Sequence, residues 1–589
     1  MKAHQYLVVL LALASWVGCV QSWGGGAQTP NKRRLSELER FEEATTDETA
    51  DRLDDFEFNP SDAAPSRRRE DRRRTQAWEA SPGDLYYDFV VIGAGTAGSI
   101  VSGELARREG YKILLVEAGG DNFDPSITNL SGYFDVAFNT FNYGFLQWGL
   151  QTTPQELKGV GEEVEPREIA LPAGKCLGGT HSINACAFVQ GHASDFDTIA
   201  AELGDTAWKW GATKKARHQI EKTLDPLKLG IEQIGGEEFV TASEEALGFP
   251  YNAEPLDGDQ YGIGASYWTA KEGLSSGIRF TAYEAFAKPM TTPHAKNGKV
   301  DVVTFHQVEK LLFDGTKVIG VSCKNTRANV LQEFYAKKEV ILSAGTYNSP
   351  KVLMLSGIGA SDQLDTLGIE TKVELKGVGE NLRDHYSAAT FWNLVDLPAD
   401  DPILFQSPTF NVFGPEKKGP PSYQMEVSGT FGSITPLRTE SVGTVRLGSA
   451  DADTPVTIDP NILSTAEDLQ LYVDGLNTIL IPFFRSLVDQ NLISEGNFNL
   501  DWNDDELVDF VSGNLMSNHH PTGTCKVGTS DDEFAVVDKD FKVFGVSNIR
   551  VVDASIFPYS PSGNTNAATM TVAMIAVDKI AQEYRSSKK

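Results

Sequence analysis

Short apolar runs that end at glycine or at a charged residue recur along the chain, and they predict buried strands. Residues 89–92 form the first run, and a G-x-G-x-x-G sequence over residues 93–98 follows it, before a helix-like segment that reaches about Arg108. A second apolar run, residues 113–116, ends in Glu117. This order of strand, tight turn, helix and strand predicts a βαβ unit.

The spacing within this unit indicates what it binds. Glycines let the backbone approach a pyrophosphate closely, and the N-terminus of the following helix stabilises the phosphate charge. Glu117 lies about twenty residues beyond the glycines, where a carboxylate can hold both hydroxyls of an adenosine ribose. We therefore predict a dinucleotide site, with an ordinary glycine-rich βαβ turn as the alternative. The stretch alone does not decide between NAD and FAD.

The remaining pattern mixes strands and helices, which predicts an α/β protein. Residues 300–321 indicate a strand pair around Asp314-Gly315, and residues 338–343 a buried strand. We expect a long loop over 123–155, a helix that opens at Ser349-Pro350, mostly strands over 389–463, a helix over 466–485 and a last helix over about 569–584.

The net charge of the chain limits the classes of partner that we expect. The chain has 589 residues, a formal net charge of −29 and a pI near 4.7. Nucleic acid and anionic membranes would be repelled, so we expect neither as a partner. The length exceeds that of one simple core and predicts about two domains.

The N-terminal region predicts entry into the secretory pathway. An apolar run over residues 6–20 follows Lys2, which is typical of a signal peptide (residues 1–22); an uncleaved signal anchor is the alternative. Residues 23–83 are rich in Gly, Ser, Pro and charge, so we expect a disordered tail or a pro-segment that is cut after Arg34 or Arg74. No later stretch approaches twenty consecutive apolar residues, which predicts a secreted mature protein without a membrane span.

Cysteines and one sequon fit that compartment. Cys19 lies in the predicted signal peptide, and the other four cysteines allow three pairings among which the sequence does not choose. They are too scattered to suggest a zinc site, and we predict no metal. Asn129-Leu130-Ser131 is a glycan acceptor if its loop is exposed.

Four ordered motifs from Tyr87 to the C-terminus resemble those of the glucose-methanol-choline (GMC) family of FAD oxidoreductases. Besides the glycine fingerprint, residues 174–179 (GKCLGG) with Ile183-Asn184 look like the first family signature, and residues 345–359 look like the second. His520-Pro521 and residues 561–568 (PSGNTNAA) resemble the C-terminal motifs.

The resemblance implies a Rossmann-like FAD-binding domain that is discontinuous in sequence, with an inserted α+β substrate-binding domain. We assign residues 84–195, 296–388 and 516–589 to the first, and residues 196–295 and 389–515 to the second. It also implies a set of FAD-binding residues, with the Val308 backbone near the adenine, Asp553-Ala554 near the pyrophosphate and ribityl chain, and Asn564 to Asn566 near the flavin ring. The set is Gly93, Gly95, Thr96, Ala97, Gly98, Glu117, Ala118, Gly119, Gly174, Leu177, Gly178, Gly179, Asn184, Val308, Asp553, Ala554, Asn564, Thr565 and Asn566.

Three positions bear on how FAD is held, by comparison with the family pattern. Some members tether FAD through a histidine, but that position corresponds here to Ile183, which forms no such bond. We therefore expect non-covalent FAD. His181 stands where the family has a small residue, and we expect it to be hydrogen-bonded within its loop; Ala173 stands where arginine is frequent.

The implied chemistry is oxidation of the CH–OH group of a small-molecule alcohol, with oxygen or a quinone as the electron acceptor. Histidine suits the general base because its ordinary pKa is near neutrality. His520 matches the active-site histidine of the family and Asn564 its partner. Consecutive side chains in extended backbone point to opposite sides, so we expect only one of His519 and His520 to face the flavin. His385 lies in a glycine-rich connector, where we expect a structural role.

Three alternatives share the fold. A fatty acid photodecarboxylase is disfavoured by His520-Pro521, because the resemblance implies that this branch lacks the pair. A cyanohydrin lyase would bind FAD without a redox step. A catalytically silent extracellular protein is disfavoured by the intact motifs. The alcohol itself (choline, aryl or aliphatic alcohol, or sugar) is not determined by the sequence.

Overall fold

The computed structural model describes residues 85–122, 146–157, 165–229, 236–264, 266–271, 277–292, 298–394, 410–428, 431–494, 496 and 498–586. All of them belong to a compact unit, Ser81–Lys589. The predicted signal peptide, the predicted tail or pro-segment, the sequon at Asn129 and most of the predicted loop 123–155 lie outside the described residues.

A βαβ unit forms the centre of the first sheet, as the apolar runs predicted. Strand β1 (Tyr86–Ile92) leads through the glycine turn into helix α4 (Thr96–Glu109), and strand β2 (Lys112–Val116) pairs with β1 in parallel. Strand β14 (Val330–Leu342) pairs in parallel with the other edge of β1. The first connection therefore leaves β1 to one side while β14 lies on the other, and this reversal opens a crevice at the carboxyl end of β1.

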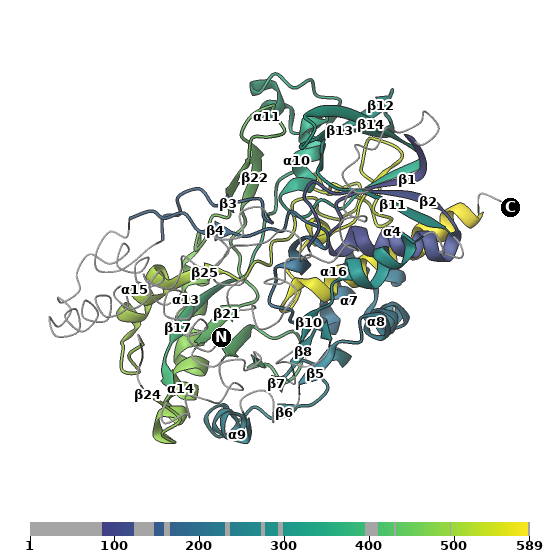
Figure 1. Ribbon diagram of the computed structural model, residues 1–589. Helices are drawn as coiled ribbons and strands as arrows, with labels where there is room; N and C mark the ends of the chain where they lie inside the picture. The colour runs from purple at the N-terminus through teal and green to yellow at the C-terminus, as the bar shows by residue number, and fades with distance from the viewer. Residues whose placement is uncertain are drawn as a thin grey trace, which may run out of the picture. The chain divides into compact units, whose positions relative to one another are not determined.

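Seven strands make up this mixed sheet (Figure 1). The other four strands are β11 (Lys299–Val303), β12 (His306–Asp314), β13 (Lys317–Asn325) and β26 (Ile549–Val551). Strands β12 and β13 form the predicted hairpin around Gly315, whereas β11 pairs in parallel with β2. The sheet thus draws strands from three separate stretches of the chain, and the predicted Rossmann-like α/β fold is confirmed.

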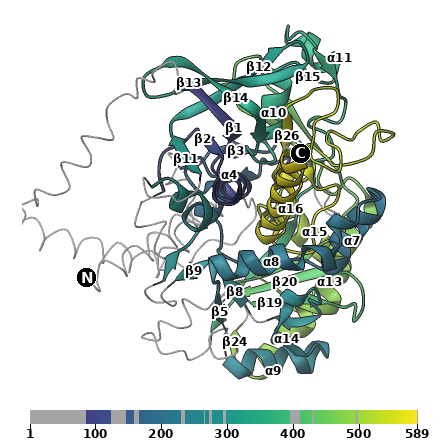
Figure 2. The ribbon, with the colours of Figure 1, turned by 90° about the vertical axis from the view of Figure 1, so that its right-hand side faces the viewer.

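Helices cover this sheet. The last helix, α16 (Thr565–Ser586), packs against α4 and against α8 (Trp210–Leu224), as Figure 2 shows. Buried side chains of α7 (Ala193–Glu202) and α8 belong to the same hydrophobic core as β1 and α16. Residues 196–224 therefore pack with the first core, although the sequence boundary at residue 195 assigned them to the substrate-binding domain.

The second sheet also has seven strands, in the order β25, β17, β21, β20, β19, β7 and β6. Their bounds are Leu515–Ser517, Tyr386–Phe391, Phe431–Pro436, Tyr423–Ser428, Phe410–Gly414, Gly262–Gly264 and Tyr251–Asn252. A separate hydrophobic core lies between this sheet and the helices α9 (Gly236–Leu247), α13 (Ala466–Gly475), α14 (Ile481–Asp489) and α15 (Asp504–Asn514).

A π-helical turn, η11 (Leu476–Leu480), joins α13 to α14. The whole run Ala466–Asp489 is long and apolar enough to cross a membrane by length and composition, but 50% of its most apolar window is buried inside the protein. Since its apolar residues fill the second core, the run has an explanation within the fold.

The remaining elements are short. They are β3 (Leu150–Gln151), β4 (Ala170–Leu171), η5 (Gly179–Ser182), η6 (Thr206–Trp208), β5 (Leu227–Leu229), η8 (Pro255–Asp257), β8 (Ser266–Trp268), β9 (Ala270–Lys271), β10 (Ile278–Arg279), η9 (Tyr283–Ala287), η10 (Lys288–Met290), α10 (Asn348–Leu355), β15 (Ile358–Gly359), α11 (Ser361–Thr366), β16 (Val373–Glu374), β18 (Asn393–Leu394), β22 (Thr444–Leu447), β23 (Val456–Asp459), β24 (Ile493–Ser494) and η12 (Ala554–Ile556).

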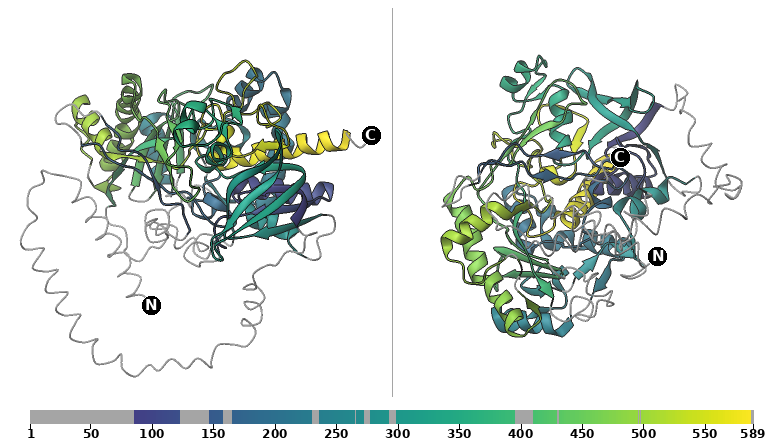
Figure 3. Two further views of the ribbon diagram at one scale, coloured as in Figure 1. Left: turned by 90° about the horizontal axis from the view of Figure 1, so that it is seen from above. Right: turned by 60° about the vertical axis from the view of Figure 1, so that its left-hand side comes forward.

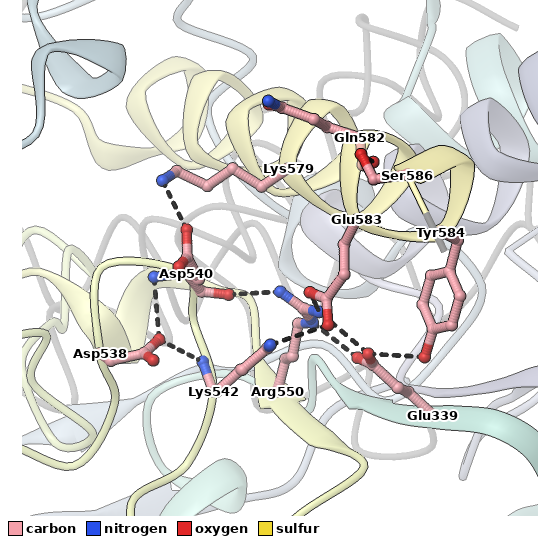
Figure 4. A network of polar contacts seen from close by, with 10 residues as sticks. All are labelled: Glu339, Asp538, Asp540, Lys542, Arg550, Lys579, Gln582, Glu583, Tyr584 and Ser586. Atoms are coloured by element: carbon pink, nitrogen blue, oxygen red, sulfur yellow. Dashed lines mark hydrogen bonds and ion pairs between the residues drawn. The ribbon is translucent and has the colours of Figure 1, made fainter. Parts of the chain in front are cut away.

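A buried ionic cluster fastens the C-terminal helix to the first sheet (Figure 4). Figure 3 shows this helix as the yellow ribbon that leads to the C-terminus. Arg550 on β26 is fully buried, and its Nε donates to Oε2 of Glu339 on β14 at 2.6 Å. Its Nη2 also contacts Glu583 of α16, and Tyr584 donates to Glu339 at 2.8 Å. A buried arginine needs such partners because an unpaired charge there is costly. The cluster therefore fastens the C-terminal end of α16, through Glu583 and Tyr584, to β14 and β26.

Candidate active site

A cavity of about 350 Å³ opens at the carboxyl ends of the first-sheet strands and extends to the second sheet. Most of the predicted site residues line it. They are Gly93, Gly95, Thr96, Ala97, Glu117, Ala118, Gly174, Gly179, Asn184, Val308, His520, Asp553, Ala554, Asn564, Thr565 and Asn566. The predicted residues outside this lining are Gly98, Gly119, Leu177 and Gly178. The structure thus brings segments from both ends of the chain to one cavity.

The three glycines of the fingerprint differ in what a side chain would meet at each position. Gly93 has φ +94°, and a Cβ there would lie 2.3 Å from the Ser343 carbonyl oxygen. A Cβ on Gly98 would lie 2.0 Å from the Gly93 carbonyl oxygen, so this glycine permits the close turn-to-helix contact. For Gly95 the nearest atom is 3.9 Å away, in Gly179. The surroundings leave room for a side chain at Gly95, and only a ligand in the cavity would require its absence.

Three predicted residues outside the lining shape the loop that faces the fingerprint. A Cβ on Gly119 would lie 1.7 Å from the Lys175 carbonyl oxygen, and one on Gly178 would lie 2.2 Å from the Ser182 hydroxyl. The Leu177 N–H donates to the Gly120 carbonyl at 2.9 Å. These residues therefore hold the backbone of residues 174–179 against the end of β2.

Glu117 is buried at the end of β2 and grips the glycine turn. Its Oε2 accepts the Ala94 N–H and its Oε1 accepts the Gly119 N–H, both at 2.9 Å. Burial raises the pKa of Glu117 to about 7, while those two N–H groups and Lys175 oppose the shift. Because each oxygen has a second lone pair, the carboxyl can still accept from ligand hydroxyls in the cavity.

The carboxylate of Asp553 accepts hydrogen bonds from groups of the protein itself. Its Oδ2 accepts the Gly345 N–H at 2.9 Å and the Ser349 hydroxyl at 2.6 Å, and its Oδ1 accepts the Ser555 N–H at 2.8 Å. The carboxylate is therefore engaged by protein donors. It holds the ends of β14 and β26 together beneath the cavity, and burial raises its pKa.

Several observations fit an extended ligand with a central negative charge. Helix α4 starts at Gly95 with no side-chain cap and no acidic residue in its first turn, so its N-terminal N–H groups can stabilise an anion. At the cavity wall, the Thr96 hydroxyl donates to Oδ1 of Asn566 at 2.8 Å. The Asn566 Nδ2 atom is buried and has no hydrogen-bond partner among the described residues, which leaves one donor for a ligand.

His520 also lines the cavity and is held from both sides. Its Nε2 is 3.1 Å from Nδ2 of Asn564, the residue before α16. Its backbone N–H donates to Oδ1 of Asp384 at 2.8 Å, and Oδ2 of Asp384 accepts the Ser517 hydroxyl at 2.6 Å. Burial, together with His385 and His519 nearby, lowers the pKa of His520 well below its ordinary value. The imidazole is thus neutral at neutral pH and able to accept a proton.

His519 also lines the cavity, contrary to the expectation that only one of the pair would face it. The expectation assumed extended backbone, but His519 has φ +60°, in the left-handed region, so the alternation of side chains is lost. Burial lowers the pKa of His519 to about 4. Its Nδ1 has no hydrogen-bond partner in the described part of the chain.

Sequence reasoning missed two groups around His520. His385, expected to be structural, has its Nδ1 3.2 Å from Nδ1 of His520. Glu426 lines the cavity beside Asn564, which helps to stabilise its charged form, although burial raises its pKa to about 7. The Gln424 Nε2 donates to both Oδ1 of Asn564, at 3.2 Å, and Oε1 of Glu426, at 3.1 Å. Gln424 and Glu426 alternate with apolar residues along 423–428, and this alternation was the sequence signal that could have indicated them.

His181 is buried with both ring nitrogens engaged. Its Nδ1 accepts the Ala282 N–H at 3.1 Å, so its Nε2 carries the proton and donates to Thr269 at 3.0 Å. Burial and Arg279 lower the pKa of His181 to about 3.

The four described cysteines are buried and unpaired.

The parallel βαβ unit and a cavity that runs from Glu117 to His520 define a dinucleotide-binding enzyme. Comparison with known families agrees: models described as GMC oxidoreductase match residues 87–387 and 439–573. The chain belongs to the GMC oxidoreductase family, whose members bind FAD.

Individual relatives cover most of the chain. Oxygen-dependent choline dehydrogenase of Vibrio vulnificus is 28% identical over 554 residues, which is 84% of this chain and 94% of the relative. Alcohol dehydrogenase [acceptor] of Pseudomonas putida is 28% identical over 568 residues, 84% and 96% of the two chains. A variant of formate oxidase from Aspergillus oryzae RIB40, studied for FAD modification, superimposes with a TM-score of 0.74 at 24% identity, over 86% of this chain and 100% of its own.

Proposed function

We propose that this protein is an FAD-dependent oxidoreductase that acts on the CH–OH group of an alcohol, with His520 as the general base. The observation that carries the proposal is the position of His520 Nε2, 3.1 Å from Asn564 Nδ2, in the same cavity as the glycine turn and Glu117. Choline and alcohol dehydrogenases among the relatives support an alcohol as the substrate.

The chain offers a holder for each part of FAD. Glu117 and the Val308 backbone would hold the adenosine, and the α4 N-terminus with Gly95 would hold the pyrophosphate. Asn184, Thr565 and Asn566 would lie against the flavin. When bound, FAD supplies the acceptor for the hydride that leaves the alcohol carbon.

The residues around His520 prepare proton removal. An alcohol hydroxyl placed between Nε2 of His520 and Nδ2 of Asn564 would give its proton to the imidazole while its oxygen accepts from the amide. The low pKa of His520 keeps Nε2 free of a proton before the substrate binds. Asp384 fixes the backbone on which this imidazole stands, and Gln424 fixes the amide of Asn564.

We also propose that FAD is bound without a covalent link. Ile183 is apolar, and the two ring nitrogens of His181 are engaged by Ala282 and Thr269, which supports this reading. Acid precipitation tests it: the yellow chromophore should stay in the supernatant, and a precipitate that keeps its flavin would contradict the proposal.

Secretion, cleavage at the end of the signal peptide and the use of oxygen or a quinone as the acceptor remain part of the proposal. The oxygen-dependent choline dehydrogenases among the relatives support oxygen as the acceptor. Anaerobic mixing of the purified flavoprotein with primary alcohols, choline, aryl alcohols and sugars tests the activity. We expect at least one class to bleach the flavin absorbance, and readmission of oxygen to restore it. If none bleaches the flavin, the alcohol oxidoreductase proposal fails.

A further inference from the structure

A second cavity, of about 290 Å³, lies behind the active site. His385 lines this cavity and does not line the first, whereas His520 lines the first and not the second. The two imidazoles meet through their Nδ1 atoms, 3.2 Å apart. The rim of the second cavity includes Thr198 and Tyr559, which are exposed at the protein surface. A line of polar atoms thus runs from the catalytic cavity through two histidines to a cavity that reaches the surface.

We propose that His385 relays the proton that His520 takes from the substrate and delivers it to water or a buffer base in the second cavity. This inference rests on the proposed function of His520 as the base. His385 touches neither substrate nor cofactor and acts only through His520, so it is a positioning and relay residue.

The hydrogen bonds fix the direction of the relay. Asn564 Nδ2 can only donate, so Nε2 of His520 accepts and the proton of the neutral ring lies on Nδ1. That N–H donates to Nδ1 of His385, which must therefore carry its own proton on Nε2. The Nε2 atom of His385 is buried and has no hydrogen-bond partner among the described residues. It is the last donor of this series, and the second cavity is the one that His385 lines.

The proton transfer balances. His520 gains the substrate proton at Nε2, its Nδ1 proton passes to Nδ1 of His385, and the Nε2 proton of His385 leaves to a water molecule in the second cavity. Both rings are then neutral again in the opposite tautomers. One proton moving the other way, from the second cavity to the first, restores the starting state, so the path serves both proton release and proton uptake.

The charges around His385 favour passage of a proton through this ring and disfavour a ring that stays protonated. Arg438 faces it from the loop after β21, and Arg383 lies in the same cavity lining. Burial and the positive charge of Arg438 lower the pKa of His385 to about 3. Oδ1 of Asp384 accepts the backbone N–H of His385, and Asp195 forms an ion pair with Arg438 at 2.7 Å. Burial and Arg438 therefore disfavour a cationic His385, and the exposed rim gives the proton an exit.

The tautomers can be tested without turnover. Nitrogen-15 NMR of histidine-labelled protein reports which ring nitrogen carries the proton, and the variants H385Q and H520Q assign the two rings. We expect a proton on Nδ1 of His520 and on Nε2 of His385 at neutral pH. The opposite pair, with Nε2–H on His520 and Nδ1–H on His385, would overturn the relay.

Kinetics supply the second test. H385A should slow anaerobic flavin reduction about tenfold or more and enlarge its solvent isotope effect, and added imidazole, which fits the vacated space, should restore the rate with saturation. Wild type and the surface control H218Q should not respond to imidazole. A slow H385A variant that imidazole does not rescue would assign a purely structural role, and an unchanged rate would exclude the relay; either overturns the inference. Failure of the wild-type protein to be reduced by any alcohol would instead reject the proposed function.

Discussion

The amide of Asn564 lies 3.1 Å from Nε2 of His520, although the two residues are 44 positions apart in sequence. Strand β25 leads into the loop that carries His520, and Asn564 stands directly before α16. The contact therefore depends on how the second sheet meets the C-terminal helix. Under the proposed function, this contact places the base directly beside the amide that would orient the substrate hydroxyl.

Asn564→Ala should weaken the orientation of the substrate hydroxyl while leaving the base in place. Loss of one neutral hydrogen bond of about 1–2 kcal/mol in the transition state predicts a decrease of roughly tenfold in kcat/KM. Stopped-flow reduction by the best alcohol of the panel measures it. Gln424→Ala serves as a graded comparison and should cost less, because Gln424 contacts Asn564 through Oδ1 and not through the Nδ2 atom beside His520; it also donates to Glu426 and Asn411. An Asn564→Ala variant with unchanged reduction would remove Asn564 from the mechanism.

The glycines of the first turn predict separable effects. Gly95→Val places a side chain where only the cavity is free, so it should weaken FAD binding while the apoprotein remains folded. Gly98→Ala puts a Cβ 2.0 Å from the Gly93 carbonyl oxygen and should destabilise the fold itself by about 1–3 kcal/mol. Fluorescence titration with FAD and thermal unfolding of the apoprotein distinguish the two. Equal affinity for FAD in Gly95→Val and wild type would contradict the assignment of this turn.

The Arg550 cluster should carry stability and little chemistry. Glu339→Gln removes the buried carboxylate partner of Arg550 and leaves the half-exposed Glu583 as its charged partner, and we expect a loss of about 3–5 kcal/mol in the free energy of unfolding. The exposed pair of Lys542 and Glu583 is a matched control, and Lys542→Ala should cost no more than about 1 kcal/mol. Denaturant unfolding of the two variants tests the difference. Equal losses would mean that burial of Arg550 does not set the strength of the cluster.

Asp384 predicts a specific dependence of stability on pH. Burial raises its pKa from the ordinary value of 3.8 to about 7, so the folded protein binds the proton more tightly than the unfolded chain. Its contribution to the free energy of unfolding is present in full below the unfolded pKa and is lost as the pH rises from about 4 to about 7. Asp384→Asn should therefore flatten the fall in stability over this window. Unfolding curves at several pH values measure the slope, and an unchanged slope would contradict the raised pKa.

The elements of the first domain could be predicted from the sequence because each obeys a local rule. Residues 89–98 and 113–117 combine an apolar run, a glycine turn and a terminal acid, and the structure places them as strand, turn and strand end. The hairpin around Gly315 and the last helix follow from turn chemistry and apolar content in the same way.

The arrangement around His520 could not be predicted in full, since it depends on contacts between distant segments. The contact of His385 with His520 spans 135 residues and has no local pattern. The direction of the His519 side chain depends on its left-handed backbone conformation, which the residue type histidine does not predict. Packing of α7 and α8 on the first core likewise reflects tertiary contacts that amphipathic periodicity alone does not assign to either domain.

The most direct test of the account is single-turnover flavin reduction by His520→Gln under anaerobic conditions, with FAD content measured in the same sample. We predict that FAD remains bound, because the contacts that fix Glu117 and Gly95 do not involve His520, and that the rate of reduction falls by about 10²–10⁴. The wild-type rate should stay constant as the pH falls below 6.5, because the pKa of His520 lies well below that value. A His520→Gln protein that keeps its FAD and is reduced at the wild-type rate would contradict the assignment of His520 as the base.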